Sequence, residues 1–410
     1  MSLRKDADTI MRAALASALP DNAVRAALKQ ADLGSGRLIL IAAGKAAWQM
    51  AKAASDQLGD RISSGVVVTK YAHSKGEIPR LTVYEAAHPV PDANSFRATQ
   101  AAIDAVTGLR KEDTVLFLLS GGGSALFEKP LIPEEDLNRL TKELLACGAD
   151  IVEMNTVRKR FSAVKGGRFA ALCSPAKVFT IVLSDVLGDR LDMIASGPAY
   201  PDSTTEADAR AIVSKYGLTV TDAMEACLKQ ETPKHLDRVE THITGSVRQL
   251  CAAAEKTCRE LGYEPVILTD QLTCTARDAG VFFANIARYY AGVGRRMAFL
   301  AGGETVVHLT GHGLGGRNQE LALASAEGIA GLNACVFSVG SDGTDGPTDA
   351  AGGIVDGSTF ETLKKQGVVI SGVLKDNDAY HALQKCNGLI ITGPTGTNVN
   401  DISVLLIDAC

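Results

Sequence analysis

The sequence predicts an α/β protein of two domains, an N-terminal Rossmann-like domain with a parallel sheet and a C-terminal α/β domain with a mixed sheet. The chain has 410 residues, more than one hydrophobic core usually supports. Apolar, β-type runs alternate with helical patterns along its length, as is typical of βαβ units. Near-continuous apolar runs such as residues 115–119 (VLFLL) fit strands covered on both faces.

Five apolar runs predict the strands of the first domain, at residues 37–43, 65–69, 81–85, 114–120 and 177–183. Helical patterns lie between them, for example at residues 46–58 and 93–106. A polar segment at residues 230–241 then interrupts the alternation. It predicts a boundary that gives a first domain of residues 1–240 and a second of residues 241–410.

Seven further runs predict the strands of the second domain, at residues 242–244, 265–269, 297–301, 305–310, 334–339, 389–391 and 403–407. The third and fourth of these are separated only by Gly302, Gly303 and Glu304. Such a short connection suits a hairpin, which would place antiparallel neighbours in the sheet. A mixed sheet is therefore expected.

Composition excludes several classes of function. The net charge is 42 − 47 = −5, so nucleic-acid binding has no electrostatic basis. Nine cysteines without a Cys-x-x-Cys pair favour free thiols in a reducing compartment. No apolar run reaches the roughly 18 residues of a membrane span, and Asp6, Asp8 and Arg12 interrupt the signal-like start. We expect a cytoplasmic protein with neither membrane nor nucleic acid as a partner.

Two loops after predicted strands are candidate phosphate sites, because ligands of open α/β sheets bind beyond the carboxyl ends of strands. In the first, Lys45 follows Gly44 at the start of a helix, where a positive charge and free N–H groups favour anions; a surface lysine is the alternative. The second follows the most apolar strand, and its backbone N–H groups could form an anion-binding nest. It consists of Ser120, Gly121, Gly122, Gly123 and Ser124, and a tight structural turn is the alternative.

Acidic stretches provide candidate metal ligands. Asp185 and Asp189, favoured over Asp192, follow the strand at residues 177–183, and carboxylates there suit Mg²⁺. Capping or pairing with a nearby arginine would explain them equally well. Asp342 lies in a later stretch of acids and hydroxyls whose spacing does not match a calcium loop. There a substrate hydroxyl or a metal-bound water is the favoured ligand, with turn stabilisation as the alternative.

A glycine-rich segment precedes Arg317 and Asn318. Its glycines at 311, 313 and 316 satisfy G-x-G-x-x-G, which by itself would suggest a dinucleotide site. The motif lies late in the chain, after the predicted hairpin, rather than in a first βα turn. An arginine at a helix start instead suits bidentate binding of carboxylate or phosphate. The basic residues at 158–168 could also meet phosphates, although a solvated helix face is the favoured interpretation.

Taken together, these segments resemble the class II glycerate 2-kinase family, whose C-terminal half is the MOFRL domain. Eight motifs carry the resemblance from about residue 38 almost to the C-terminus: AAGKAA, HPVPDANS, LSGGGSALF, NTVRKRFSAVKGGRFA, SDVLGDRLDMIASGP, AGGETVVHLTGHGLGGRNQELAL, SDGTDGPTDAAGGIVD and TGPTGTNVNDI. The chain departs from the family at Arg160 and Phe161, where a His-Leu or His-Ile pair is expected.

The resemblance implies phosphorylation of D-glycerate at its 2-hydroxyl in an interdomain cleft, with ATP and Mg²⁺ as cofactors. It places the family's active-site lysine at Lys45 and its arginine at Arg317. We therefore expect residues 120–124 to hold nucleotide phosphates and Lys45 to neutralise the transferring group.

The remaining candidates complete this predicted site. Arg317, with Asn318, would bind the substrate, while Asp342 would lie near the attacking hydroxyl. Asp185 and Asp189, with Glu304, would anchor Mg²⁺. Two other interpretations stay open: an NAD(P)H-dependent hydroxypyruvate reductase, and a non-catalytic module that binds small phosphorylated acids.

Overall fold

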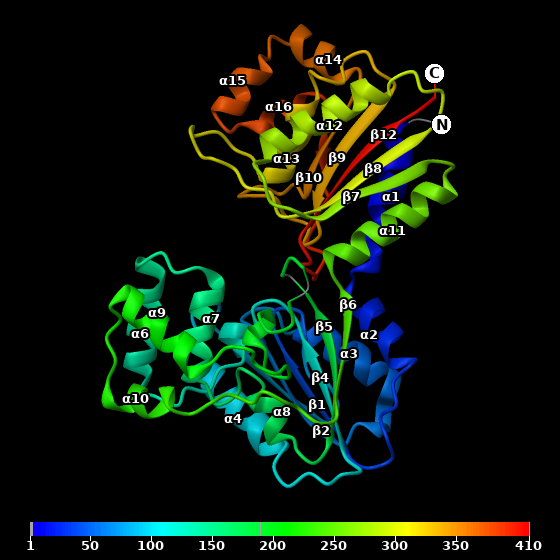
Figure 1. Cartoon of the computed structure of the whole chain (residues 1–410). Helices are drawn as coiled ribbons and strands as arrows, with labels where there is room; N and C mark the ends of the chain where they lie inside the picture. The colour runs from blue at the N-terminus through cyan, green and yellow to red at the C-terminus, as the bar shows by residue number, and fades with distance from the viewer. Residues whose placement is uncertain (1–2, 185, 189, 410) are drawn as a thin grey trace. The chain divides into compact units, whose positions relative to one another are not determined.

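The computed structural model describes residues 3–184, 186–188 and 190–409 (Figure 1). They form two compact units. The first, Ala23–Thr244, we call the Rossmann-like unit, and the second, which joins the described residues up to Asn22 to those from Gly245 onward, we call the mixed-sheet unit. Each unit contains one six-stranded sheet.

The sheet of the Rossmann-like unit has the strand order β3-β2-β1-β4-β5-β6. The pairs β1–β2, β1–β4, β2–β3 and β4–β5 are all parallel, as expected from the apolar runs. Every residue of β1 and β4 is buried, because helices cover both faces. The strands are β1 (Leu38–Ala43), β2 (Ser64–Lys70), β3 (Leu81–Ala86), β4 (Thr114–Leu119), β5 (Lys177–Leu183) and β6 (Val239–Gly245).

Alternate residues of β1 enter two separate cores. Ile39 and Ile41 lie in a core with residues of α4 and α8, whereas Leu38 and Leu40 lie in a core with residues of α2 and α3. This two-sided burial follows from the period-two alternation of side chains along a strand. The covering helices are α2 (Pro20–Leu28), α3 (Ala47–Leu58), α4 (Ala93–Ala105), α5 (Gly123–Leu126) and α8 (Arg168–Leu172), and α3 continues into the 3₁₀ turn η1 (Gly59–Arg61).

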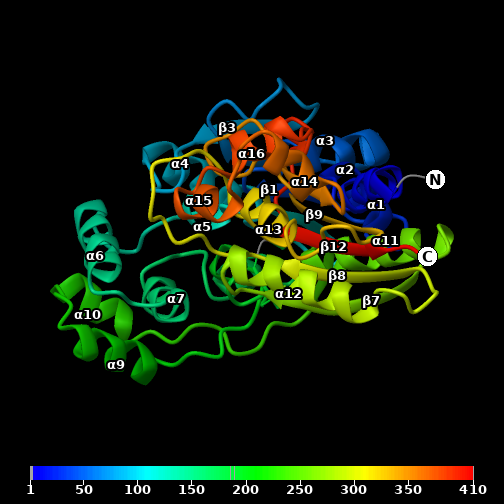
Figure 2. The ribbon, with the colours of Figure 1, turned by 90° about the horizontal axis from the view of Figure 1, so that it is seen from above.

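Four further helices of this unit gather in one group beside the sheet (Figures 1 and 2). They share a core of their own. Asp150 caps α7 in a capping box with Glu153, which satisfies free N–H groups of its first turn. The helices are α6 (Glu134–Ala146), α7 (Ile151–Arg160), α9 (Glu206–Tyr216) and α10 (Asp222–Leu228), and the 3₁₀ turn η2 (Ile194–Ser196) lies between β5 and α9.

The mixed-sheet unit has the strand order β11-β10-β9-β12-β8-β7. β7 and β8 are parallel, whereas β12 is antiparallel to both β8 and β9, so the sheet is mixed as predicted. The strands are β7 (Glu264–Leu272), β8 (Met297–Gly303), β9 (Ala334–Gly340), β10 (Gly352–Asp356), β11 (Leu389–Ile390) and β12 (Asp401–Ile407).

Helices cover both faces of this sheet as well (Figure 1). One core joins alternate β8 residues such as Phe299 to α12, α13 and the three helices that follow β10. The other joins Leu300 of β8 to α1 and α11. The helices are α1 (Leu3–Ser17), α11 (Val247–Glu260), α12 (Ala276–Tyr290), α13 (Arg317–Ser325), α14 (Thr359–Lys365), α15 (Ile370–Lys375) and α16 (Ala379–Lys385). None of the described helices is both long and apolar enough to span a membrane.

The predicted hairpin is wrong, although the mixed sheet is right. Residues 305–310 form a loop whose only sheet-like contact is an isolated bridge from Val306 to Thr275. β8 already has β12 on one edge and β7 on the other, which leaves no edge for a hairpin partner. The antiparallel neighbours come instead from β10 and β12.

The two units divide the chain differently from the predicted domains 1–240 and 241–410. Residues 242–244 belong to β6, in the first sheet, and α1 packs in the second unit. The apolar face of α1, with Ile10 and Ala14 fully buried, contacts α11 and strands β9, β10 and β12. The long-range burial of this amphipathic helix places it with the later half of the chain.

Candidate active site

In the Rossmann-like unit, two predicted phosphate loops lie at the switch point of the sheet. β1 and β4 are neighbours, and the strand order reverses between them; ligands of such sheets bind outside the carboxyl ends of strands at this point. The N–H of Lys45 donates to the Gly121 carbonyl (2.9 Å). The N–H of Ala46 donates to Oγ of Ser120 (3.0 Å). The structure therefore brings Lys45 and the glycine-rich loop together.

Glycine is required at two positions of these loops. Gly44 has φ +126°, and a Cβ atom there would lie 2.2 Å from Oγ of Ser120. Gly122 has φ +83°, and a Cβ there would lie 3.0 Å from Cδ2 of His88 and 3.2 Å from Cγ of Lys45. The close approach at Gly44 excludes a side chain, a side chain at Gly122 would require its neighbours to shift, and both backbone conformations are rarely adopted by other residues.

Lys45 is half-buried and makes no ion pair with any residue that the structure describes. Its carbonyl accepts a hydrogen bond from Oγ1 of Thr69 (3.2 Å) and lies 3.1 Å from Nδ1 of His73. The backbone of Lys45 is thus fixed by β2 and by the loop that follows it, while its ammonium group keeps its donors. Burial, and then the charges of Lys45, Lys70 and His73, lower the pKa of His88, which favours a neutral imidazole beside the loop.

A chain of polar side chains extends from the end of the glycine-rich loop. Oγ of Ser124 lies 3.3 Å from Oγ of Ser196, and Ser196 donates to Oδ1 of Asn155 on α7 (2.8 Å). Ala195 and Ser196 both have positive φ, 50° and 61°, a strained conformation for residues other than glycine. The sequence analysis missed Ser196 and Asn155, since only their shared place in long motifs could have drawn attention to them.

In the mixed-sheet unit, Arg317 begins α13 next to the ends of three strands. Its Nε and Nη2 donate to the carboxylate of Asp401, at 2.5 and 3.0 Å, and Nη1 donates to Oε1 of Glu304 (2.9 Å). Asp401 opens β12 opposite Gly303 and Gly340. The bidentate pair fixes the guanidinium plane, and Nη1 and Nη2 each keep one N–H for a ligand.

Charge and burial have opposite effects on the pKa values of Arg317 and Asp401. Burial alone would lower the pKa of Arg317, but the hydrogen bond and charge of Asp401, with the charge of Glu304, raise it above its usual value. Burial raises the pKa of Asp401, whereas Arg317 opposes the rise. Asp401 was not a predicted site residue; an acid at the first position of an otherwise apolar strand was the available signal.

Asn318 is buried and belongs to a network beneath Arg317. Asp345 accepts from the N–H groups of Asn318 (3.1 Å) and Gln319 (2.9 Å) at the start of α13. Oδ1 of Asn318 accepts from Oγ of Ser338 on β9 (2.5 Å). Burial raises the pKa of Asp345 to about 6, although these hydrogen bonds oppose the rise. Asn318 therefore helps to position α13, and direct contact with substrate stays a prediction.

Asp342 lies on the loop that follows β9, where its Oδ1 accepts from the N–H of Thr344 (2.9 Å). A Cβ atom on Gly340 would lie 3.3 Å from Oδ1 of Asp342 and 3.4 Å from Oδ1 of Asp401. Asp342, Asp401 and Arg317 thus share one end of the sheet.

The G-x-G-x-x-G glycines serve close packing in the structure. Cβ atoms on Gly311 and Gly313 would lie 2.3 Å from Cα of Asp376 and 2.4 Å from Cβ of Asp378. The N–H of Gly313 donates to the Asp376 carbonyl (2.8 Å). The segment is a loop packed against the α15–α16 connection and is not the first turn of a βαβ unit, so a dinucleotide fingerprint does not fit it.

The predicted metal ligands Asp185 and Asp189 lie outside the described residues. Glu304 is described, and its Oε1 pairs with Arg317. Within the described ranges there is no group of three or more histidine, cysteine, aspartate or glutamate side chains placed to hold a metal. The assignment of these three residues to Mg²⁺ therefore stays a prediction.

The basic segment at residues 158–168 is not a solvated helix face. Lys159, Arg160 and Lys165 are at most 1% exposed. Arg160, which stands where the family pattern has histidine, donates to Glu231 (2.9 Å) and to the Thr204 carbonyl (2.9 Å). Arg160 thus fixes α7 to the neighbouring segments around Thr204 and Glu231.

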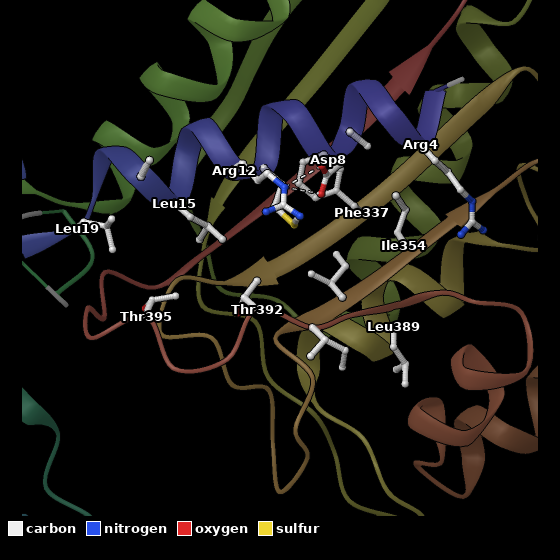
Figure 3. A pocket seen from close by; sticks show the side chains of 15 residues that line it. Arg4, Asp8, Arg12, Leu15, Leu19, Phe337, Ile354, Leu389, Thr392 and Thr395 are labelled. Carbon is white, nitrogen blue, oxygen red and sulfur yellow. Dashed lines mark hydrogen bonds and ion pairs between the residues drawn. The ribbon is translucent and has the colours of Figure 1, made fainter. Parts of the chain in front are cut away.

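The mixed-sheet unit also has a cavity of about 760 Å³ along α1. Side chains of α1 such as Leu15, and Leu19 just beyond the helix, line it together with Phe337, Ile354 and the segment at 389–395 (Figure 3). It contains none of the predicted site residues.

Two family models and several known proteins match this chain. Residues 6–229 match a family model described as a domain of unknown function, DUF4147, and residues 297–401 match the model of the MOFRL family. A D-glycerate 2-kinase from Thermotoga maritima is 53% identical over 99% of this chain and 99% of its own length. A glycerate 2-kinase from Pyrococcus horikoshii is 41% identical over 91% of this chain and 88% of its own.

A solved structure resembles the whole chain. The crystal structure of a glycerate kinase from Thermotoga maritima superimposes with a TM-score of 0.95 at 52% identity, and the match covers 99% of each chain.

Proposed function

This chain belongs to the class II glycerate 2-kinase family, and from that premise we propose that it transfers the γ-phosphoryl group of ATP to the 2-hydroxyl of D-glycerate. The observation that carries the proposal is the pairing of the Gly44–Ala46 turn with the glycine-rich loop at the switch point of the Rossmann-like sheet. A half-buried lysine that has no counter-ion among the described residues and lies beside a strand-to-helix loop suits phosphate groups.

The backbone N–H groups of residues 121–124 hold phosphate oxygens of the nucleotide in this mechanism, whereas the N–H of Ser120 donates to the Ala43 carbonyl (3.0 Å). Lys45 neutralises the negative charge of the transferring phosphoryl group. Phosphoryl transfer depends chiefly on such positioning and charge stabilisation. The nucleotide enters as its Mg²⁺ complex, and Asp185 and Asp189, with Glu304, are the residues we assign to that ion.

Arg317 binds an anionic group of the substrate through the N–H groups that Asp401 and Glu304 leave free. Asp342 is the acid we assign to a position near the attacking hydroxyl. The cytoplasmic location stays a prediction from composition.

One assay separates this reaction from its rivals. With D-glycerate and ATP-Mg²⁺ we expect ADP release and 2-phosphoglycerate, identified by NMR, and chelation of Mg²⁺ should stop the reaction. Oxidation of NADH with hydroxypyruvate would instead show a reductase. Binding of phosphorylated acids without turnover would show a binding module.

Two substitutions test the assigned residues in the same assay. Lys45→Ala and Arg317→Ala should each lower kcat by about 10²-fold or more, because each removes a charge that stabilises the transition state. Arg317→Ala also leaves Asp401 buried without its partner, so Asp401→Asn and the double variant control for stability. Near-normal turnover in either alanine variant would contradict its assigned role.

A further inference from the structure

The basic segment around α7 contains cations that are neutralised by the fold. Lys159 pairs with Asp202 (3.1 Å), Arg160 with Glu231 (2.9 Å), and Lys165 with Glu128. Since an unpaired buried charge is costly, these pairs explain how the side chains can be buried.

Arg168 also has a structural task. Its Nη1 donates to the carbonyls of Lys159 (2.9 Å), Arg160 (3.2 Å) and Ser162 (2.7 Å). These carbonyls lie at or just beyond the C-terminal end of α7, where a cation is favoured.

Arg158 is different. Across the described residues its side chain makes no hydrogen bond and no ion pair, and its Nε is buried without a partner. The side chain is half-buried rather than extended into solvent. An unsatisfied, partly desolvated guanidinium costs free energy in the ligand-free chain. An anionic ligand would supply the hydrogen-bond acceptor that the guanidinium group of Arg158 lacks.

The surroundings of Arg158 indicate which anion. Arg158 follows Asn155 by three residues on α7, so the two side chains leave neighbouring positions on the helix surface. Asn155 accepts from Ser196, and Ser196 lies 3.3 Å from Ser124 at the end of the glycine-rich loop. The N–H of Gly166 also donates to the Ser196 carbonyl (3.0 Å). α7 is therefore connected to the loop assigned to nucleotide phosphates.

The electrostatic environment of Lys165 also shows which residues lie near Arg158. The pKa of Lys165 is lowered to about 8, chiefly by burial; Glu128 opposes the lowering and the charge of Arg158 contributes to it. Arg158 and Lys165 are thus close enough to repel each other. Glu128 is paired with Lys165, so it does not serve as the counter-ion of Arg158.

We propose that Arg158 is a phosphate-binding residue that contacts the phosphate chain of the nucleotide beside the glycine-rich loop. This inference rests on the proposed function, because it needs a nucleotide in the Rossmann-like unit. Arginine is suited to the role, since its fork of N–H donors binds phosphate oxygens in pairs.

Calorimetric titration of ATP tests the assignment without turnover. Arg158→Met should weaken ATP binding by roughly 10- to 100-fold, the range for a lost charge-assisted hydrogen bond, and Arg158→Lys should restore part of the affinity. Arg139→Met, which removes an arginine of α6 paired with Asp136 and Glu143, should leave the affinity unchanged.

Thermal unfolding distinguishes ligand binding from a structural role. Arg158→Met should not lower Tm, because no partner is lost, whereas Lys159→Met should lower it by breaking a buried pair. Unchanged ATP affinity, a lowered Tm of Arg158→Met, or an increase confined to the KM for D-glycerate would each overturn the assignment. A wild-type chain that binds no ATP would overturn the proposed function together with it.

Discussion

At the scale of single residues, buried acids fix the parts of the mixed-sheet unit that surround Arg317. Asp401 orients the guanidinium, and Asp345 binds the first N–H groups of α13. Both carboxylates are nearly inaccessible to water. Burial favours their neutral forms, while the donors around them favour the charged forms. The outcome of this competition should be measurable.

Asp345 should make stability depend on pH. Its pKa is raised to about 6 in the folded chain from about 3.8 in the unfolded chain. The folded state therefore binds the proton more tightly, and the stabilisation from this group is lost as pH rises from about 4 to 6. The free energy of unfolding of wild type minus that of Asp345→Asn should fall by roughly 3 kcal/mol over that range.

Urea denaturation of both proteins at several pH values would measure this difference. The Asn variant is a suitable control because it keeps an oxygen acceptor but does not titrate. A difference that is constant with pH, or one that grows with pH, would contradict the raised pKa.

At the scale of elements, the two loops of the Rossmann-like unit show what patterns can predict. An apolar strand followed by three glycines indicated the position of the loop at residues 120–124, because glycine tolerance and strand burial are local properties. The contact of Gly121 with Lys45 followed from the parallel sheet. The link through Ser196 to α7 was not predictable, since it depends on how a strained loop folds back.

Substitution of Gly122 should lower activity for a reason specific to the site. Gly122→Ala would place a methyl group against His88 and Lys45, at 3.0 to 3.2 Å, and should lower kcat/KM by about 10-fold or more through displacement of the lysine. Gly108→Ala is the matched control, because Gly108 has a similar φ of +69° with nothing within 4 Å of the added atom.

Both substitutions should lower stability by about 1–2 kcal/mol through the left-handed backbone. Steady-state kinetics with thermal unfolding of both variants would separate the two effects. Equal kinetic losses in the two variants would show that backbone strain, rather than contact with Lys45, is responsible.

At the scale of the whole molecule, the sequence did not predict to which of the two units the N-terminal helix belongs. Helical periodicity predicts that one face of α1 is apolar, but not which sheet it covers. In the structure, a buried polar contact joins α1 to the mixed-sheet unit: Asp6 accepts from the hydroxyl of Tyr263 (2.8 Å) and from Nη2 of Arg296 (2.6 Å). Local runs predicted most strands correctly, whereas partners distant in the chain decide the edges and the boundaries.

Asp6 should accordingly be important for stability. Asp6→Ala leaves Tyr263 without its acceptor and removes a charged hydrogen bond to Arg296, so the free energy of unfolding should fall by about 2–3 kcal/mol. Asp8→Ala, on the same helix, breaks only an exposed pair with Arg12 and should cost less than about 1 kcal/mol. Denaturant unfolding of the two variants gives the comparison, and equal losses would contradict the anchoring role.

The separation of α1 from the rest of its unit has a consequence for biosynthesis. Domains tend to fold during translation in the order in which they leave the ribosome. Residues 23–244 are continuous and can fold as soon as they emerge. The helix at residues 3–17 precedes this segment in the chain, yet α11 and the strands that cover its apolar side follow it. The hydrophobic surface of this helix therefore stays uncovered in the nascent chain while residues 23–244 are translated and is fully covered only after the later strands emerge, and chaperones that bind such surfaces have that interval in which to act.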